Sequence, residues 1–382
     1  MEKQTQITPA TKRLLFIDIM RGLAVIWMIE AHITHAVMDP AWKDNFLWNL
    51  IAVSNGFVAV TFLFCAGAGF WLASNKKFDD YKQFNAPFVN HLKKILLILF
   101  TGYWLHLPIP SFTKFLQMPN ADWLRFLEAD VLQNIAVSSL IAIFLMVSLP
   151  KLKHLSIASL ILTLLMFTLA PIIWQMNLYE KMPFVIGAYF AHLPISKFPI
   201  FHWSGYFFAG IFFSHFFMNY KNKEKLAVIL IVSTIAIITL LLTTNHLHPL
   251  YGWQVWWDCH PGHNFFRLSG AVLIFASLFL LEKIIPPKIA KFMSMAGQES
   301  LFIYVFHLML VYGSVLNVGL SYFMPQNQNL ISTISLYLAV TSITLMIANY
   351  WHKLKKEKPK YAKVIFRVLF WGFLLKFFIS KY

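Results

Sequence analysis

The chain of 382 residues is 58 % hydrophobic and only 13 % charged, and its mean hydropathy is +0.62. This composition excludes a soluble domain and predicts an all-α, polytopic integral membrane bundle. The formal net charge of +16 is high enough for nucleic-acid binding. However, the basic residues lie in short connections between apolar stretches, as the positive-inside rule describes, so we expect no nucleic-acid partner.

Apolar runs of about twenty residues recur along the chain, and an α-helix needs this length to cross a bilayer. They predict about ten or eleven transmembrane helices, the lower number applying if one amphipathic segment does not cross. The first run is too long for a cleavable signal peptide and is expected to start transfer uncleaved. The runs lie at 14–38, 46–74, 88–107, 130–149, 155–176, 201–219, 226–243, 264–282, 300–321, 330–350 and 362–380.

Most lysines and arginines fall in every second connection, counted from the N-terminus. Because cytoplasmic connections carry the excess of basic residues, this pattern predicts a cytoplasmic N-terminus and an extracytoplasmic C-terminus in a cell (inner or plasma) membrane. The connections on the predicted outer side are longer and richer in aromatic residues and histidine. Long outer connections in a small membrane protein are commonly functional.

The first apolar run carries a stripe of ionisable residues. Asp18, Arg21, His32 and His35 share one helix face, whereas Glu30 falls on another. Arg21 and His32 are separated by about 16 Å along a helix, roughly half the hydrocarbon thickness. Charged groups at this depth cost several kcal/mol each and usually face a bundle interior or a wet cavity. A buried ion-pair network that only orients helices is the simpler alternative.

Histidine at this position can accept a proton from a hydroxyl or amine, or act as a nucleophile. We therefore predict His32 and His35 as catalytic candidates, with an orienting acid from another helix or an outer connection. Arg21 can hold a phosphate or a carbonyl oxygen, and Asp18 lies within one helical turn of it. Their salt bridge is the simpler alternative, and both roles can coexist.

Further polar residues lie at the ends of later runs. The outer connections and helix ends contribute candidate acceptor-binding residues: Asp130, Gln133, Trp257, Asp258, His260 and His263. The stretch from Asp258 to His263 has ligand types for zinc but not the spacing of a zinc motif, so no metal is expected. Arg267, Tyr304 and His307 are candidates for donor contacts together with Arg21. The simpler alternatives are snorkelling for Arg267 and a helix–helix hydrogen bond for the other two. Gly297 is expected to mark the turn before that helix.

Several motifs resemble one family of membrane enzymes. The pattern of Arg13, Asp18, Arg21-Gly22, an apolar run and His32 resembles the catalytic domain of heparan-α-glucosaminide N-acetyltransferases. The spacing of Arg21 and His32 also resembles the Arg-x10-His pattern of acyltransferase family 3. Matching stretches follow in the same order at 62–70, 129–138, 201–213 and 297–307.

The resemblance implies a single transmembrane acyltransferase-like domain over 1–382, with core motifs in 13–310 and additional C-terminal helices in 330–380. It also implies acetyl-CoA as the cytoplasmic acyl donor and an extracytoplasmic sugar or glycan as the acceptor. One departure matters: the eukaryotic enzymes carry their presumed catalytic histidine in the first outer loop. Here that loop, 39–46, has none, so His32 or His35 must take the role.

The leading hypothesis from the sequence is therefore a membrane acyltransferase that modifies a cell-envelope glycan. The alternative is a proton-coupled transporter or exporter in which Asp18, Arg21, Glu30 and His32 form a relay. A membrane subunit that only binds partners is a third possibility. Coenzyme A dependence separates the first hypothesis from the other two. Membrane lipids are expected partners, and the sequence leaves a homodimer open.

Overall fold

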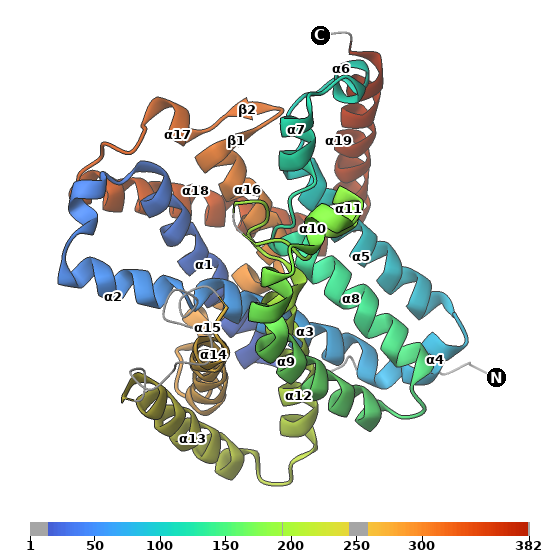
Figure 1. Cartoon of the computed structure of the whole chain (residues 1–382), viewed down its shortest axis with the longest axis vertical. Helices are drawn as coiled ribbons and strands as arrows, with labels where there is room; N and C mark the ends of the chain where they lie inside the picture. Colours follow the sequence, from blue (N-terminus) through green and yellow to red (C-terminus); the bar gives the residue numbers. More distant parts are fainter. Residues whose placement is uncertain (1–13, 193, 244–258, 381–382) are drawn as a thin grey trace.

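The computed structural model describes residues 14–192, 194–243 and 259–380 and is almost entirely helical (Figure 1). The strands among these residues form one two-stranded antiparallel hairpin, β1 (Gly313–Ser314) and β2 (Asn317–Val318). The predicted class, an all-α polytopic membrane protein, is confirmed.

Most of the long helices coincide with the predicted apolar runs; α15 lies between two of them. They are α1 (Leu15–Val37), α2 (Phe46–Asn55) followed by α3 (Val58–Ser74), α5 (Ala86–Leu105), α8 (Val131–Ser148), α9 (Leu152–Gln175), α12 (Ile200–Asn219), α13 (Lys223–Thr243), α14 (Pro261–Leu281), α15 (Pro287–Gln298), α16 (Ser300–Tyr312), α18 (Leu330–Glu357) and α19 (Pro359–Ile379).

Short helices fill the connections. They are α4 (Phe78–Lys82), α6 (Phe112–Leu116), α7 (Asn120–Phe126), α10 (Leu178–Lys181), α11 (Phe184–Gly187), α17 (Leu320–Phe323) and the 3-10 turns Pro40–Lys43 and Asn75–Lys77. Four of them, α6, α7, α10 and α11, lie in two of the connections predicted to be extracytoplasmic.

By length and apolar composition alone, six helices of the described chain qualify as membrane spans, with α2 to α4 taken as one. The number rises to seven if the bent pair α15 and α16 is one span. Each of α1, α5, α12 and α19 has 20 or more residues and is long enough to cross. These four contain more polar or charged side chains, so the predicted count of ten or eleven depends on their crossing as well.

Helix α1 lies at the centre of the bundle and packs against α3, α14, α15, α16 and α18. Helix α12 packs against α3 and α9 on the other side of α3. The apolar core between these helices includes Phe16, Met20, Phe64 and Phe275, all fully or almost fully buried. Most of the polar side chains of α1 are therefore partly or fully buried between helices, with His35 as the exposed exception.

Two helix crossings are close enough that only glycine fits. A Cβ atom at Gly22 of α1 would overlap the backbone oxygen of Met293, and one at Gly297 of α15 would overlap that of Asp18. The predicted turn at Gly297 is therefore wrong: this glycine lies inside α15 and allows α1 and α15 to touch. The helix break follows it at Glu299, where α15 and α16 meet at 74°.

The predicted run 300–321 ends earlier than expected. Helix α16 stops at Tyr312 because Gly313 adopts φ +86°, a left-handed conformation that favours glycine. The hairpin of β1 and β2 and the short α17 follow it. The C-terminal helix α19 stands at the edge of the molecule (Figure 1) and contacts α5 through the ring pairs Phe100–Phe370 and Trp104–Phe373.

Candidate active site

Arg21 lies at the inner end of the stripe on α1. Its guanidinium is 3.8 Å from the carboxylate of Asp18, and it donates a long hydrogen bond of 3.5 Å to the backbone oxygen of Cys65. Both side chains are partly accessible, at 23 % and 14 %. The predicted Asp18–Arg21 salt bridge is thus present as a loose contact that leaves the guanidinium free to bind a further anion.

Arg21 also lines a cavity of about 330 Å³ between α1, α3, α5, α8 and α16. The cavity wall includes His91, Lys94, Ser139 and Ser300 together with apolar residues. The ring of His91 is held by the hydroxyl of Tyr81 at 2.6 Å. Two cations and a histidine in the wall of one cavity suit an anionic group such as a phosphate.

His32 lies in the other half of α1 and meets a second histidine. The rings of His32 and His307 of α16 are 5.1 Å apart, edge to face, and the ring of Tyr312 lies 5.6 Å from His32. Tyr312 donates a hydrogen bond to the backbone oxygen of His32. The Nδ1 of His32 is buried without a hydrogen-bond partner among the described residues.

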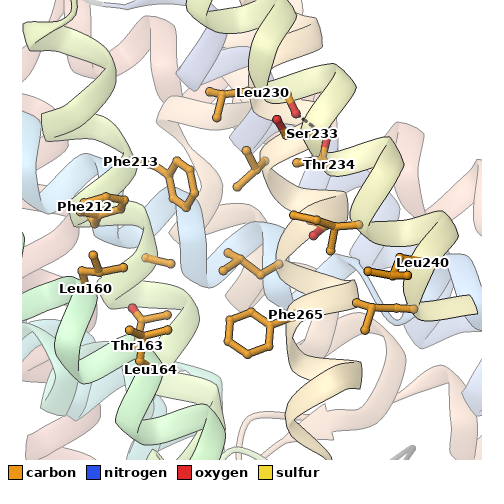
Figure 2. A pocket seen from close by; sticks show the side chains of 16 residues that line it. Leu160, Thr163, Leu164, Phe212, Phe213, Leu230, Ser233, Thr234, Leu240 and Phe265 are labelled. Carbon is orange, nitrogen blue, oxygen red and sulfur yellow. Dashed lines mark hydrogen bonds between the residues drawn. The ribbon is translucent and has the colours of Figure 1, made fainter. Parts of the chain in front are cut away.

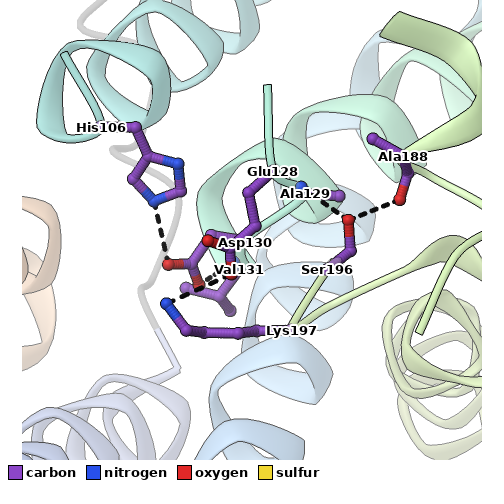
Figure 3. Close-up of polar contacts among 8 residues, drawn as sticks. All are labelled: His106, Glu128, Ala129, Asp130, Val131, Ala188, Ser196 and Lys197. Atoms are coloured by element: carbon purple, nitrogen blue, oxygen red, sulfur yellow. Dashed lines mark hydrogen bonds and ion pairs between the residues drawn. The ribbon is translucent and has the colours of Figure 1, made fainter. Parts of the chain in front are cut away.

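An ion pair joins the N-terminal end of α8 to the end of α5 (Figure 3). The carboxylate of Asp130 is 3.2 Å from Nε2 of His106, at the end of α5, and also accepts the backbone N–H of Val131 at 2.6 Å. Burial raises the pKa of Asp130, but the hydrogen bond and charge of His106 and the charge of Lys197 outweigh it and lower this pKa to about 2.

The Asp130 carboxylate acts through space on His32, Tyr304 and Tyr312. An acid from another helix thus lies near His32, as the sequence predicted, and it comes from the N-cap of α8. A carboxylate in this place stabilises an imidazolium that forms when histidine takes a proton. The group of His32, His307, Asp130 and His106 can therefore serve as a general base with its supporting charges.

The segment before α12 holds this end of α8 in place. Ser196 accepts a hydrogen bond from the backbone N–H of Ala129 and donates one to Ala188 (Figure 3). Lys197 pairs with Glu128 at 3.2 Å. The amide of Asn134, one turn into α8, donates to the backbone oxygens of Phe198 and Pro199. Asp130 therefore sits on a backbone that is bonded on both sides.

One aromatic pair separates the inner cavity from the outer histidines. Phe62 of α3 lines the cavity and stacks on Tyr304 of α16, with ring centroids 6.1 Å apart. Tyr304 in turn contacts His307, whose ring contacts His32. The structure thus places Tyr304 and His307 beside His32 rather than in the cavity of Arg21.

The other two predicted residues of α1, Glu30 and His35, do not join the group around His32. His35 is exposed, and its Nδ1 bonds the backbone oxygen of Ala31. Glu30 accepts a hydrogen bond from Thr34 and faces Tyr337 of α18. Because Glu30 points away from His32, the structure does not assemble the relay that the transporter hypothesis requires.

Three of the predicted acceptor-binding residues, Gln133, His260 and His263, can be placed in the structure, and two others lie outside the part it describes. Gln133 is fully buried against Gly102 of α5, and both atoms of its amide lack a partner among the described residues. His260 caps α14, its Nδ1 accepting the N–H of Gly262, and His263 is buried in the first turn. Trp257 and Asp258 lie outside the described residues.

Arg267 does not approach Arg21. It lies over the ring of Trp203 at 5.7 Å and beside Gly56 at the start of α3, in the outer half. Within the described chain, no group of three or more histidine, cysteine, aspartate or glutamate side chains is placed to hold a metal ion.

The comparison with protein families decides the relationship. The family described as heparan-alpha-glucosaminide N-acetyltransferase, catalytic, matches residues 13–253. The chain belongs to this family. The resemblance predicted from the motifs is thereby confirmed, and membership makes the chain a membrane acetyltransferase of the multi-pass type. No curated protein matches the sequence.

The matched segment contains Arg21, His32, His106 and Asp130 but ends before α14 and α16. Three residues of the site were missed by sequence reasoning: His91, Lys94 and His106. His106 ends an apolar run, and an ionisable residue at a helix end opposite Asp130 is itself an indication of function. Only the pairing of α5 with α8 shows that the two side chains meet.

Proposed function

We propose that the chain transfers an acetyl group from cytoplasmic acetyl-CoA to a sugar or glycan on the extracytoplasmic side of the cell membrane. One observation supports the proposal: the central helix α1 has a cavity lined by Arg21 and Lys94 towards one end, which the basic connections predict to be cytoplasmic, and His32 with its histidine and carboxylate neighbours towards the other. Such an arrangement suits a donor and an acceptor that lie on opposite sides of a membrane.

The inner cavity supports the donor side. Arg21 and Lys94 would bind phosphate oxygens of coenzyme A, and Ser139 and Ser300 would bind polar groups of its pantetheine arm. A volume of 330 Å³ lies at the small end of ligand cavities. It therefore holds the acyl-bearing arm and leaves the nucleotide at the cytoplasmic mouth.

The outer group supports proton transfer. His32 would take the proton of the attacking hydroxyl or amine while the new C–O or C–N bond forms and the thioester C–S bond breaks. Asp130 would stabilise the resulting imidazolium, and the departing thiolate would receive the proton. The Phe62–Tyr304 pair lies between donor and base, so the acetyl-bearing arm must pass it.

The test uses sealed inside-out vesicles that contain the protein and a trapped envelope-glycan extract, with acetyl-labelled coenzyme A added outside. Wild type is expected to label the trapped glycan. His32→Ala is expected to reduce the rate at least 100-fold, because general-base catalysis contributes about 10²–10⁴-fold. Arg21→Ala is expected to weaken donor binding, measured as a higher KM for acetyl-CoA.

His35→Ala provides the matched control, because it removes an exposed histidine one turn from His32. Loss of activity in His35→Ala with full activity in His32→Ala would transfer the role of base by one turn. Absence of label in every vesicle, together with no thermal stabilisation by coenzyme A, would overturn the proposal.

A further inference from the structure

A second cavity lies away from the candidate active site. It measures about 450 Å³ and is enclosed by α9, α12, α13 and α14. Figure 2 shows Phe212, Phe213 and Leu160 on one side of it and Leu230 and Leu240 on the other. The cavity reaches the outer ends of α13 and α14, since its wall includes residues of the last turn of α13 and the first turns of α14.

The wall is almost entirely apolar, and its side-chain polar groups are the hydroxyls of Thr163, Ser233, Thr234 and Ser269. The hydroxyl of Thr163 is bonded to backbone oxygens of Ser159 and Gly205, and that of Thr234 to those of Leu230 and Ile231. Water would form few hydrogen bonds in this cavity, whereas a hydrocarbon chain needs none. The cavity therefore favours a hydrocarbon chain over water. At roughly 30 Å³ for a water-sized group, the cavity holds about fifteen methylene-sized units.

Helix α13 forms the wall of the cavity that faces the surrounding lipid. It is the least enclosed of the helices that qualify as spans, since only 17 % of its most apolar 18-residue stretch is buried. It packs mainly against α14, and Figure 1 shows it at the edge of the molecule. A chain can therefore enter from the surrounding lipid between α13 and the rest of the bundle.

Above the cavity, the same helices carry a cluster of polar atoms that lack partners. Phe167, Tyr206 and Phe265 form an aromatic layer at the outer end of the cavity. Beyond that layer lie His202 and Trp174, with ring centroids 5.5 Å apart.

Neither ring nitrogen of His202 nor the Nε1 of Trp174 has a hydrogen-bond partner among the described residues, although these atoms are buried. The Nε of Arg267, two residues after Phe265 in α14, also lacks a hydrogen-bond partner among the described residues. No ion pair within the described chain involves Arg267. Buried polar atoms without partners are uncommon in proteins and call for a bound group that satisfies them.

The polar cluster lies next to one exposed residue. Exposed His192 stacks on Trp174 at 4.9 Å, and Trp203 lies 4.7 Å from His202 and under Arg267. Aromatic faces suit the apolar faces of sugar rings, while the free ring nitrogens suit hydroxyl groups. The guanidinium of Arg267, which has no ion-pair partner within the described chain, suits a phosphate.

We propose that α9, α12, α13 and α14 bind a sugar joined through phosphate to one hydrocarbon chain, taken from the outer leaflet. The chain fills the 450 Å³ cavity, the phosphate meets Arg267, and the sugar lies against Trp174, His202 and Trp203. This inference rests on the proposed function in one respect: it makes a lipid-linked sugar the acetyl acceptor.

The test uses glucose joined through phosphate to a farnesyl chain with a photoreactive diazirine at its end. The full chain is reconstituted in phosphatidylcholine nanodiscs without coenzyme A and irradiated, and the labelled peptides are identified by mass spectrometry. Label is expected in the parts of α9, α12, α13 and α14 that line the cavity. The unlabelled compound should compete, whereas farnesol and glucose 1-phosphate should compete at least tenfold less.

Two cavity-filling variants, Ser233→Trp and Ile237→Trp, are expected to reduce labelling at least tenfold. The matched control is Val232→Trp, which places the same ring on the neighbouring, lipid-facing position of α13 (62 % exposed). His202→Phe keeps an aromatic ring but removes both nitrogens, so it should weaken competition by the sugar-bearing compound and leave that of farnesol unchanged.

Label spread over all lipid-exposed helices, or label unaffected by Ser233→Trp and Ile237→Trp, would overturn the inference. Its failure is separable from failure of the proposed function. Acetyl transfer to a soluble sugar without cavity labelling would retain the acetyltransferase and reject the lipid site. Cavity labelling without acetyl transfer to any acceptor would support the lipid site and count against its role in acceptor binding.

Discussion

At the scale of single residues, His32 is defined by what surrounds it. It meets His307 and Tyr312 directly and the charge of Asp130 through space. None of these neighbours lies within ninety residues of it in the sequence. An ionisable side chain held in this way by groups of several helices is a functional candidate rather than a simple helix-orienting contact.

Asp130→Asn is expected to lower the rate of acetyl transfer by about 10- to 100-fold, because the variant cannot stabilise the His32 imidazolium. The matched control is Glu128→Gln, which removes a nearby carboxylate that pairs only with the half-exposed Lys197. Because Lys197 is 55 % exposed, solvent screens this pair, which therefore contributes about 0–1 kcal/mol. Equal rate losses in the two variants, measured in the vesicle assay, would contradict the assignment.

The stability of the protein is expected to depend on the protonation of Asp130. Its pKa in the folded protein is about 2, below the ordinary value of 3.8, so ionised Asp130 stabilises the fold above pH 4. This stabilisation is lost as the pH falls from about 4 to 2. It amounts to roughly 2 kcal/mol. Thermal unfolding in detergent should therefore separate wild type from Asp130→Asn at pH 6, and the separation should shrink towards pH 3.

At the scale of elements, the position of Arg21 depends on how closely α1 approaches its neighbours. Gly22 and Gly297 let α1 and α15 touch, and Gln298 of α15 donates a hydrogen bond to Asp18 at 3.3 Å. The inner end of the polar stripe is thus held from the α15 side, while Cys65 of α3 holds it from the other.

Gly22→Ala and Gly297→Ala are each expected to destabilise the protein by about 1–3 kcal/mol or more, since the added methyl group overlaps backbone atoms. Gly372→Ala in α19 is the control, because a Cβ there meets nothing within 4 Å. Thermal unfolding in detergent measures the difference. A melting temperature of Gly22→Ala equal to that of Gly372→Ala would contradict the close crossing of α1 and α15.

The bend between α15 and α16 is attached to α18 by one buried carboxylate. Glu299 is 3 % exposed and bonds His352 at 2.7 Å and Lys355 at 2.6 Å. Glu299→Ala is expected to cost about 1–3 kcal/mol, because it removes two charge-assisted hydrogen bonds and leaves the partly buried His352 without this partner. Lys355→Ala should cost less, since this lysine is 42 % exposed, and unfolding of both variants compares them.

At the scale of the whole molecule, the two candidate sites need opposite faces of the membrane. The orientation inferred from the basic connections places the cavity of Arg21 on the cytoplasmic side. Both native cysteines, Cys65 and Cys259, are buried, so single introduced cysteines can report the orientation.

Asn120→Cys, at the start of α7, is expected to react with a membrane-impermeant maleimide on intact cells. Lys288→Cys, at the start of α15, is expected to react only after the membrane is opened. Both positions are exposed, so accessibility to the reagent depends on the side of the membrane. The reverse pattern would invert the topology and would place the inner cavity on the wrong side for acetyl-CoA.

The sequence by itself determined the helical membrane class, the approximate helix positions, the polar stripe of α1 and the family. These features depend on local periodicity, on apolar length and on motifs that neighbouring residues define. Even Glu30 could be assigned to another face from helical spacing alone. The close crossing of α1 and α15 at Gly297 was not predicted, because a helix–helix contact has no local signature. The early end of α16 was missed because the apolar run continues past Gly313.

Only the tertiary structure decided which polar groups meet. It brought Asp130 and His106 to His32, moved Tyr304 and His307 from the donor side to the histidine side, and separated Arg267 from Arg21. The physical reason is that helices in a bilayer choose their partners by close packing and by pairing buried polar groups. Both depend on surfaces from distant parts of the chain, and the spacing within one helix does not specify them.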